Sequence, residues 1–306
     1  TAYSHLDAIP KKIKLEDELP TLIDETRENV HGEEEPYLIF NNVGAWPVQR
    51  TADRKQDAVY IEVWPPYDRY ASIAQLIRDA RTYAKDDKST ILAAYLKPFR
   101  EGKREKALPA AKLLMGSIVS NGATHLLTGE NQTALTQGYY SDYTKFSDSE
   151  AEAIRRYYDY MIRYENLFFD PELQDVTMTH TGWDNYEYQC TNHKVSSYGE
   201  AGKIWMILRE KDYRKCIYLL NLCGQSEDYW NEGKEEPNIQ KDIKFTVQVD
   251  TPVEKICFST PDGENMDAIE LSFTERATKT GKFIDFTVPS LNYWTTIWID
   301  TRKETI

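Results

Sequence analysis

Apolar residues in the first half of the chain gather into four short runs, with stretches of helical periodicity between them. Within each run the apolar side chains are consecutive rather than alternating, which is typical of a strand buried on both faces. The four runs cover residues 38–44, 58–64, 91–96 and 124–129. Helices are predicted where apolar residues recur every three or four positions, over 17–29, 70–84 and 108–120. Strands that alternate with helices predict a parallel sheet.

A further helix is expected to begin after Ser147. Glu150 stands three residues beyond this serine, and Ser-x-x-Glu is the pattern of a capping box, in which each side chain binds the other residue's backbone N–H. The helical pattern continues from there to about residue 169.

From about residue 171 the pattern changes to short segments in which apolar and β-branched residues alternate with polar ones. The segments cover residues 203–210, 215–223, 243–249, 254–260, 269–275, 282–289 and 293–299. Short alternating segments with turn residues between them predict an antiparallel β-sandwich of about seven strands. The expected fold class is therefore α/β plus all-β, with one domain over residues 1–170 and a second over 171–306.

Polar side chains collect where the four predicted parallel strands end. They are Asn41, Asn42, Glu62, Tyr95, Lys97, Glu130 and Asn131. In a (β/α)8 barrel the carboxyl ends of the strands form the rim that carries the active site. A doubly wound sheet is the competing fold, but the chain lacks the glycine-rich phosphate loop that such sheets use for nucleotides.

Glu62 is a carboxylate within an apolar strand, between Ile61 and Val63. Burying a charge is costly unless the charge is paired or used. The residues alone leave two interpretations open. Glu62 either points outward or pairs with an arginine, or it serves chemistry at the rim, where Tyr60 and Trp64 place aromatic rings beside it.

Charge and composition restrict the partners. The 306 residues carry a net charge of −13, which argues against nucleic acid and anionic membrane surfaces because their phosphates would be repelled. No apolar run approaches the about 18 residues that a membrane span needs. The 21 Tyr, 7 Trp and 10 Phe either stack on sugar rings or fill a β-rich core.

The cysteines indicate neither a metal nor a cofactor. They are Cys190, Cys216, Cys223 and Cys257. No pair has the spacing of a metal site, and the five histidines form no ligand pattern with them. We expect free, mostly buried thiols, with one disulfide left open, and neither a bound metal nor a cofactor.

Several segments together resemble glycoside hydrolase family 66, which comprises the endo-dextranases and the cycloisomaltooligosaccharide glucanotransferases. The segments are YLIFNNVGAWPV (37–48), AVYIEVWPPYDRYASIAQLIRDAR (58–81), ILAAYLKPF (91–99), GENQTALTQGYYSDY (129–143) and YYDYMIRYENLFF (157–169). WNEGKEEP (230–237) and SLNYWTTIWI (290–299) resemble the C-terminal β-domain of that family. YIEVWP is the most specific part of the match.

The resemblance implies a (β/α)8 barrel that cleaves α-1,6-glucan with retention, using an aspartate on the fourth strand as nucleophile and a glutamate on the sixth as acid/base. In strand order the four runs match the fifth to eighth strands, so Glu62 takes the acid/base position. The first four strands have no counterpart here. We therefore expect the C-terminal half of a barrel, with the nucleophile and an N-terminal half-barrel segment upstream of Thr1. Asp7 is the only upstream candidate within the chain.

The remaining predicted substrate contacts are Asn41, Asn42, Trp64, Asp68, Tyr95, Glu130, Asn131 and Tyr139. Alternatives stay open for several of them. The asparagines at 41 and 42 suit a strand-ending turn, Trp64 could wall the pocket, Asp68 could cap the following helix, and Tyr139 could serve packing.

Hydrolysis of dextran is the expected reaction. The cyclising members of the family carry a carbohydrate-binding insertion after the seventh strand, whereas only about ten residues follow ILAAYL here before the next helix. The alternatives are a non-catalytic carbohydrate-binding paralogue, a cyclising glucanotransferase and another α-glucan barrel hydrolase. The resemblance favours a secreted bacterial protein over a cytoplasmic one, although no signal-peptide pattern precedes the first helix.

Overall fold

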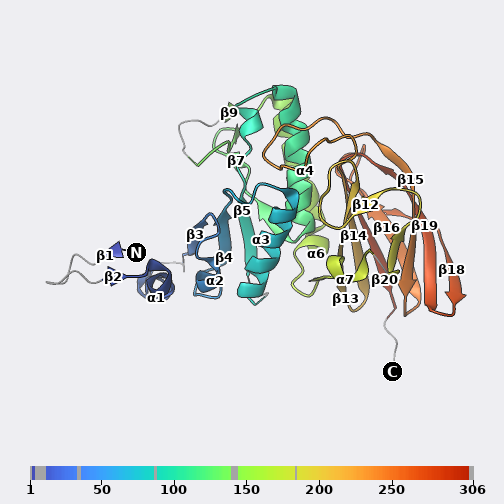
Figure 1. Ribbon diagram of the computed structural model, residues 1–306, viewed down its shortest axis with the longest axis horizontal. Helices are drawn as coiled ribbons and strands as arrows, with labels where there is room; N and C mark the ends of the chain where they lie inside the picture. The colour runs from blue at the N-terminus through green and yellow to red at the C-terminus, as the bar shows by residue number, and fades with distance from the viewer. Residues whose placement is uncertain are drawn as a thin grey trace.

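The structure is a computed structural model that describes residues 2–3, 12–32, 36–85, 88–138, 144–182 and 185–302. Its N-terminal part contains a four-stranded parallel sheet in the order β3-β4-β5-β6 (Figure 1). These strands are Ile39–Val43, Ala58–Glu62, Ser89–Ala93 and Ala123–His125. Val43 lies opposite Glu62, and Glu62 lies opposite Ala93, so β3, β4 and β5 end at the same level. In the described residues this sheet is open and forms no closed barrel.

The predicted helices are confirmed within two residues at each end. They are α1 (Leu15–Asn29), α3 (Tyr70–Tyr83) and α4 (Ala107–Ser120). The capping box is also confirmed. The Ser147 side chain accepts from the Glu150 N–H, and the Glu150 carboxylate accepts from the Ser147 N–H at the start of α5 (Asp148–Arg163). The predicted continuation to residue 169 is broken at Tyr164, after which α6 (Glu165–Phe168) follows.

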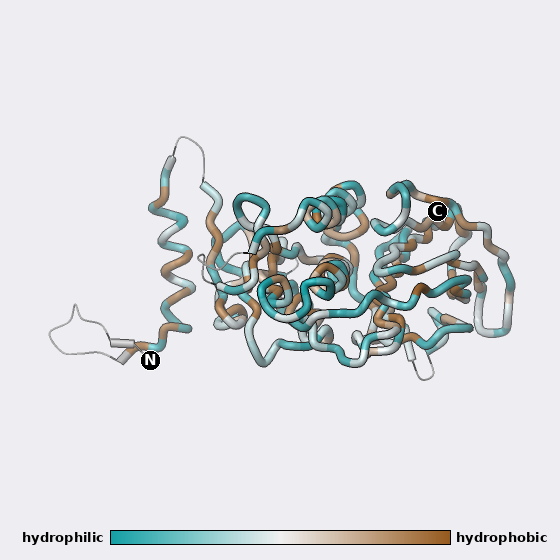
Figure 2. Tube along the Cα trace, turned by 90° about the horizontal axis from the view of Figure 1, so that it is seen from above, coloured by the Kyte–Doolittle hydropathy of each residue, from teal (hydrophilic) through white to brown (hydrophobic). Residues whose placement is uncertain are grey.

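Short elements complete the N-terminal part. They are β1 (Ala2–Tyr3), β2 (Lys12–Ile13), α2 (Val48–Thr51), and the 3-10 turns η1 (Lys97–Phe99) and η2 (Arg104–Lys106). Strands β1 and β2 pair antiparallel. Helix α1 lies at one end of the elongated molecule, and the C-terminal sheets lie at the other (Figures 1 and 2).

Two expectations for the parallel strands were wrong. Strand β3 is not buried on both faces, because Ile39 is 46% and Val43 52% exposed and β3 is an edge strand of the sheet among the described residues. The run 124–129 is not one strand. The Leu126 N–H still donates to the Leu92 carbonyl of β5, but the next residue, Leu127, instead accepts a hydrogen bond from the N–H of Leu135. A separate antiparallel sheet follows, made of β7 (Thr128–Gly129), β8 (Thr133–Ala134) and β9 (Thr144–Lys145).

The C-terminal part holds two further sheets. The larger has the order β10-β13-β14-β20-β16-β17, with β12 beside β13, and the smaller has the order β11-β15-β19-β18. The larger sheet consists of Gln174–Asp175, Ile204–Lys211, Arg214–Asn221, Trp294–Thr301, Val253–Ser259 and Ile269–Glu270, with Val195–Ser196 as β12. The smaller consists of Tyr188–Cys190, Gln240–Val249, Gly281–Leu291 and Phe273–Thr278. Helix α7 (Thr177–His180) lies between β10 and β11 in the chain.

The two C-terminal sheets share an apolar core, to which Met206 and Leu208 contribute from one sheet and Phe245 and Ile284 from the other. Two details differ from the expected antiparallel arrangement. Strands β12 and β13 are parallel. The predicted strand 269–275 divides between the sheets, because β17 pairs with β16 while β18 pairs with β19.

The other face of the larger sheet packs on helices of the N-terminal part. The ring of Trp294 lies 4.9 Å from that of Tyr160 and 5.2 Å from that of Phe168, between ring centroids. Helix α4 approaches so closely that a Cβ on Gly116 would lie 2.7 Å from a methyl of Leu220. One apolar core therefore fixes the parallel sheet and its helices against the C-terminal sheets.

Candidate active site

Glu62 ends strand β4 and lies on its less covered face. Val59 and Ile61 are fully buried on one face, while Tyr60 and Glu62 are only partly buried on the other, because side chains alternate along a strand. The Tyr95 hydroxyl donates to Glu62 Oε1 over 2.8 Å, and the Asn41 amide lies 3.5 Å from Oε2. Both of these partners are neutral, and among the described residues no arginine pairs with this carboxyl.

Three adjacent segments supply these groups. Asn41 belongs to β3, Glu62 to β4, and Tyr95 follows β5 by two residues. The parallel register brings the strand ends together, which is why residues about 20 and 33 positions away meet at Glu62. Trp64 adds an aromatic wall, since its ring lies 5.8 Å from that of Tyr95 at 55° and is 37% exposed.

Gly138 lies directly beside the Glu62 carboxyl and the rings of Trp64 and Tyr95. A Cβ built on this residue would lie 2.8 Å from Glu62 Oε1, 3.4 Å from the Trp64 ring and 3.7 Å from the Tyr95 ring. The hydrogen bond from the Leu96 N–H to the Leu135 carbonyl anchors this segment beside β5. Sequence reasoning missed Gly138, because a glycine in a polar stretch carries no sign of which side chain it will touch.

The Tyr95 hydroxyl is held in its protonated form. Burial raises the pKa of Tyr95, and the hydrogen bond to Glu62 and the neighbouring Tyr60 and Glu62 charges raise it further. Tyr95 is therefore a permanent donor toward the carboxyl at all moderate pH values. The sequence predicted Tyr95 as a substrate contact, and the structure places its hydroxyl on Glu62.

Other predicted residues lie apart from this cluster. Asn42 is fully buried, donates to the Tyr60 carbonyl over 2.8 Å and accepts from the Thr51 hydroxyl over 2.6 Å. Both the nitrogen and the oxygen of its amide are hydrogen-bonded within the protein, so Asn42 does not belong to the candidate site. Glu130 and Asn131 are exposed in the turn between β7 and β8, beyond the end of the parallel strand.

Asp68 lies in the connection from β4 to α3. Helix α3 has Arg69 at its N-cap and no side-chain capping bond, so the alternative in which Asp68 caps the helix is wrong. Its backbone carbonyl accepts from the Trp230 N–H. Asp7 and Tyr139 fall outside the described residues.

Three further observations concern the residues that the structure describes. No set of three or more His, Cys, Asp or Glu residues there could hold a metal ion. None of the helices described is both long and apolar enough to cross a membrane. All four cysteines are free, and Cys216 and Cys257 are buried, whereas Cys190 and Cys223 are partly exposed.

The Glu62 carboxyl, at the ends of the parallel strands, can donate a proton to a bound ligand or accept one from it. It is partly exposed, so a ligand can reach it, and its orientation is fixed by a phenol that remains protonated. Aromatic faces such as that of Trp64 suit the apolar faces of sugar rings.

Comparisons with known proteins show which family this sequence resembles. The model of glycosyl hydrolase family 66 matches residues 4–298. A cycloisomaltooligosaccharide glucanotransferase of Niallia circulans is 28% identical over 193 residues, which cover 62% of this chain and 19% of that protein. A second protein of the same name and organism is 27% identical over 191 residues, covering 61% and 19%. The chain thus spans about a fifth of the length of these curated relatives.

A solved structure agrees with the fold. It is a Paenibacillus sp. cycloisomaltooligosaccharide glucanotransferase in complex with cycloisomaltoheptaose, with a TM-score of 0.83 and 14% identity. The match covers 95% of this chain and 59% of that one. Because the family model extends over nearly the whole sequence, the chain belongs to glycosyl hydrolase family 66.

Proposed function

We propose that this chain carries the acid/base side of an active site that cleaves α-1,6-glucosidic bonds of dextran or isomaltooligosaccharides with retention. The observation that supports it best is the position of Glu62. Its carboxyl lies at the end of a parallel strand, partly exposed, and accepts a hydrogen bond from the Tyr95 hydroxyl. Family membership supports chemistry on glycosidic bonds.

In the proposed mechanism, Glu62 first donates its proton to the leaving glycosidic oxygen while a second carboxylate attacks the anomeric carbon. Glu62 then accepts a proton from the incoming water or sugar hydroxyl, whose oxygen attacks the anomeric carbon and displaces the second carboxylate. Retaining enzymes hold the two carboxyls about 5–5.5 Å apart. We propose that the nucleophile belongs to the N-terminal half-barrel segment. Asp7 is the weaker candidate.

The substrate would contact the residues around this carboxyl. Trp64 offers its ring face to a glucose unit, and Asn41 offers its amide to a hydroxyl. Asp68, Glu130, Asn131 and Tyr139 remain proposed contacts farther along the chain, since polar side chains at a rim suit sugar hydroxyls.

We also propose that β3 to β6 are the fifth to eighth strands of a (β/α)8 barrel, in a domain over 1–170, followed by a β-sandwich domain over 171–306. The open edge of β3 supports this proposal. This edge pairs with no other strand among the described residues, and Ile39, Asn41 and Val43 are exposed on the face of β3 that continues the Glu62 face of β4. An N-terminal half-barrel segment is the proposed neighbour.

Hydrolysis is the proposed outcome, with glucan transfer as the second candidate. Residues 94–106 connect β5 to α4 through two 3-10 turns, which leaves no room for an inserted carbohydrate-binding domain. The named relatives, which are glucanotransferases, favour transfer. Linear products from dextran support hydrolysis, and cyclic products support transfer.

The test is Glu62→Gln in the full-length protein. Loss of a general acid/base is expected to lower kcat on dextran by about 10²–10⁴-fold. Glu152→Gln, at an exposed position of α5, is the matched control and should leave kcat unchanged. Near-full activity of Glu62→Gln would remove Glu62 from this role. A wild-type protein that binds isomaltooligosaccharide without cleaving it would instead support the carbohydrate-binding alternative.

A further inference from the structure

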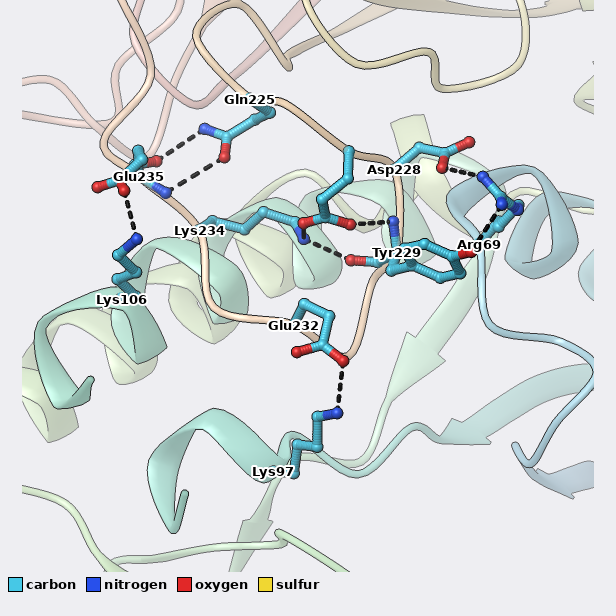
Figure 3. Close-up of polar contacts among 10 residues, drawn as sticks. Arg69, Lys97, Lys106, Gln225, Asp228, Tyr229, Glu232, Lys234 and Glu235 are labelled. Carbon is cyan, nitrogen blue, oxygen red and sulfur yellow. Dashed lines mark hydrogen bonds and ion pairs between the residues drawn. The ribbon is translucent and has the colours of Figure 1, made fainter. Parts of the chain in front are cut away.

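A loop of the C-terminal part, residues 222–239 between β14 and β15, lies against the strand-end side of the parallel sheet; we refer to it as the β14–β15 loop. Figure 3 shows its charged contacts. Asp228 and the Tyr229 hydroxyl accept from Arg69, which precedes α3. Glu232 pairs with Lys97 of η1, and Glu235 pairs with Lys106 of η2. The loop therefore spans the connections that follow β4 and β5.

Trp230 holds the connection after β4. Its indole N–H donates to the Tyr67 carbonyl over 2.6 Å, and its backbone N–H donates to the Asp68 carbonyl over 3.1 Å. The indole is almost fully buried, at 3% exposure. A further backbone bond runs from the Tyr70 N–H to the Asp228 carbonyl. This connection contains Trp64, the aromatic wall of the candidate site.

Asn231 holds the connection after β5. Its Oδ1 accepts from the Lys97 N–H over 2.9 Å. Lys97 follows Tyr95 by two residues, so this bond restrains the segment that carries the Tyr95 hydroxyl. Two consecutive residues of one loop thus tie together the two segments whose rings, Trp64 and Tyr95, flank Glu62.

The loop is braced from within, so it can act as a rigid support. Lys234 is 1% exposed, pairs with Glu227 and donates to the Tyr229 carbonyl. Glu227 in turn accepts from the Tyr229 N–H over 2.6 Å. The Gln225 side chain makes two hydrogen bonds with the backbone of Glu235, at 2.8 Å and 3.2 Å. These contacts fix the path of the loop on both sides of Trp230 and Asn231 (Figure 3).

We propose that Trp230 and Asn231 are positioning residues of the active site, which set the spacing of Trp64 and Tyr95 and, through Tyr95, the orientation of the Glu62 carboxyl. The proposal rests on the proposed function of Glu62. It gives the C-terminal part an indirect role in catalysis, exerted through the positions of Trp64 and Tyr95.

The test uses Asn231→Leu in the full-length protein, acting on isomaltooligosaccharides. Leucine keeps the size of asparagine and removes the acceptor for the Lys97 N–H. We expect kcat/KM to fall about tenfold, because a small misplacement of a catalytic group lowers the rate strongly. Asn231→Asp keeps an acceptor oxygen and should restore most of the activity. Glu235→Gln, which removes the Lys106 pair of the same loop, should leave kcat/KM unchanged.

A double-mutant cycle separates positioning from general stabilisation. If Asn231 acts through Tyr95, then in a Tyr95→Phe protein the Asn231→Leu change should cost less than about twofold, because coupled residues are not additive. Full additivity, or an Asn231→Leu protein as active as Glu235→Gln, overturns the proposal. If Asn231→Leu fails to fold, Trp230→Phe decides, because it removes the indole N–H that donates to the Tyr67 carbonyl and puts a smaller ring in its place. Unchanged kcat/KM overturns the proposal, whereas a loss of several fold supports it.

The outcome for Glu62→Gln distinguishes the two levels of the argument. If Glu62→Gln and Tyr95→Phe both keep full activity, the proposed function itself fails. If Glu62→Gln is inactive while the loop variants match Glu235→Gln, only the positioning role fails.

Discussion

Gly138→Ala adds a single methyl group beside the candidate acid/base carboxyl. The new Cβ would lie 2.8 Å from Glu62 Oε1, whereas ordinary contacts begin at 3.4 Å. Gly138 does not adopt a left-handed φ, so alanine fits its backbone. The conflict therefore falls on the carboxyl, which is the end of a flexible side chain and must move by about 0.6 Å, the difference between the two distances.

This shift would lengthen the 2.8 Å hydrogen bond from Tyr95 toward the limit of a hydrogen bond. A hydrogen bond to a charged group contributes about 1.5–3 kcal/mol, and a misplacement of about 1 Å can cost about 100-fold in rate. We therefore expect kcat/KM on isomaltooligosaccharides to fall about 10- to 100-fold. The free energy of unfolding should change by less than about 1 kcal/mol, because no backbone or core atom has to move.

The assay pairs initial rates with urea denaturation of the same full-length protein. Gly263→Ala is the matched control, because it also adds a methyl group without a left-handed φ, with its closest contact at 3.2 Å to the Asn265 carbonyl. It should leave kcat/KM unchanged, and its 3.2 Å contact with a backbone oxygen should lower the free energy of unfolding only slightly. In a Glu62→Ala background, Gly138→Ala should cost nothing further. An unchanged kcat/KM for Gly138→Ala alone would refute the reasoning that this carboxyl must keep its place.

Three further predictions concern stability, measured by urea denaturation. Burial lowers the pKa of His125 to about 4 and outweighs the hydrogen bond to the Ala94 carbonyl, which by itself would raise that pKa. The unfolded chain binds this proton near pH 6.5, so the stability that His125 contributes is complete above that pH. The free energy of unfolding should fall by up to about 3 kcal/mol as the pH drops from 6.5 to 4. His125→Gln should flatten this dependence on pH. A variant with the same dependence as the wild type would contradict the prediction. Ser147→Ala should cost about 1 kcal/mol through loss of the N-cap, whereas Ser147→Thr should cost much less. Lys234→Met should destabilise the protein by about 1 kcal/mol, because Glu227 loses its buried partner but, being one third exposed, keeps contact with water. The double variant with Glu227→Gln should recover part of this loss, and no destabilisation would argue against the internal brace.

Local patterns predicted the elements well because their causes are local. The apolar spacing of α3 and α4 and the Ser147–Glu150 capping box lie within one or two helical turns, and these helices appear where the sequence indicates. Glu62 was found by the same means, since a carboxylate between Ile61 and Val63 is unusual in any strand. The sequence therefore determined the α/β and all-β segments, the parallel order and the residue at the centre of the proposed site.

The tertiary structure decided the neighbours of that residue. Asn41 and Asn42 are adjacent in sequence, yet one faces Glu62 and the other is buried, because consecutive side chains point to opposite faces of a strand. Gly138 lies 76 positions from Glu62 in the sequence, and Asn231 lies 134 positions from Lys97. Such contacts depend on how sheets and loops pack over long range. No local propensity encodes them, so only the folded chain shows which backbone and which loop hold the carboxyl in place.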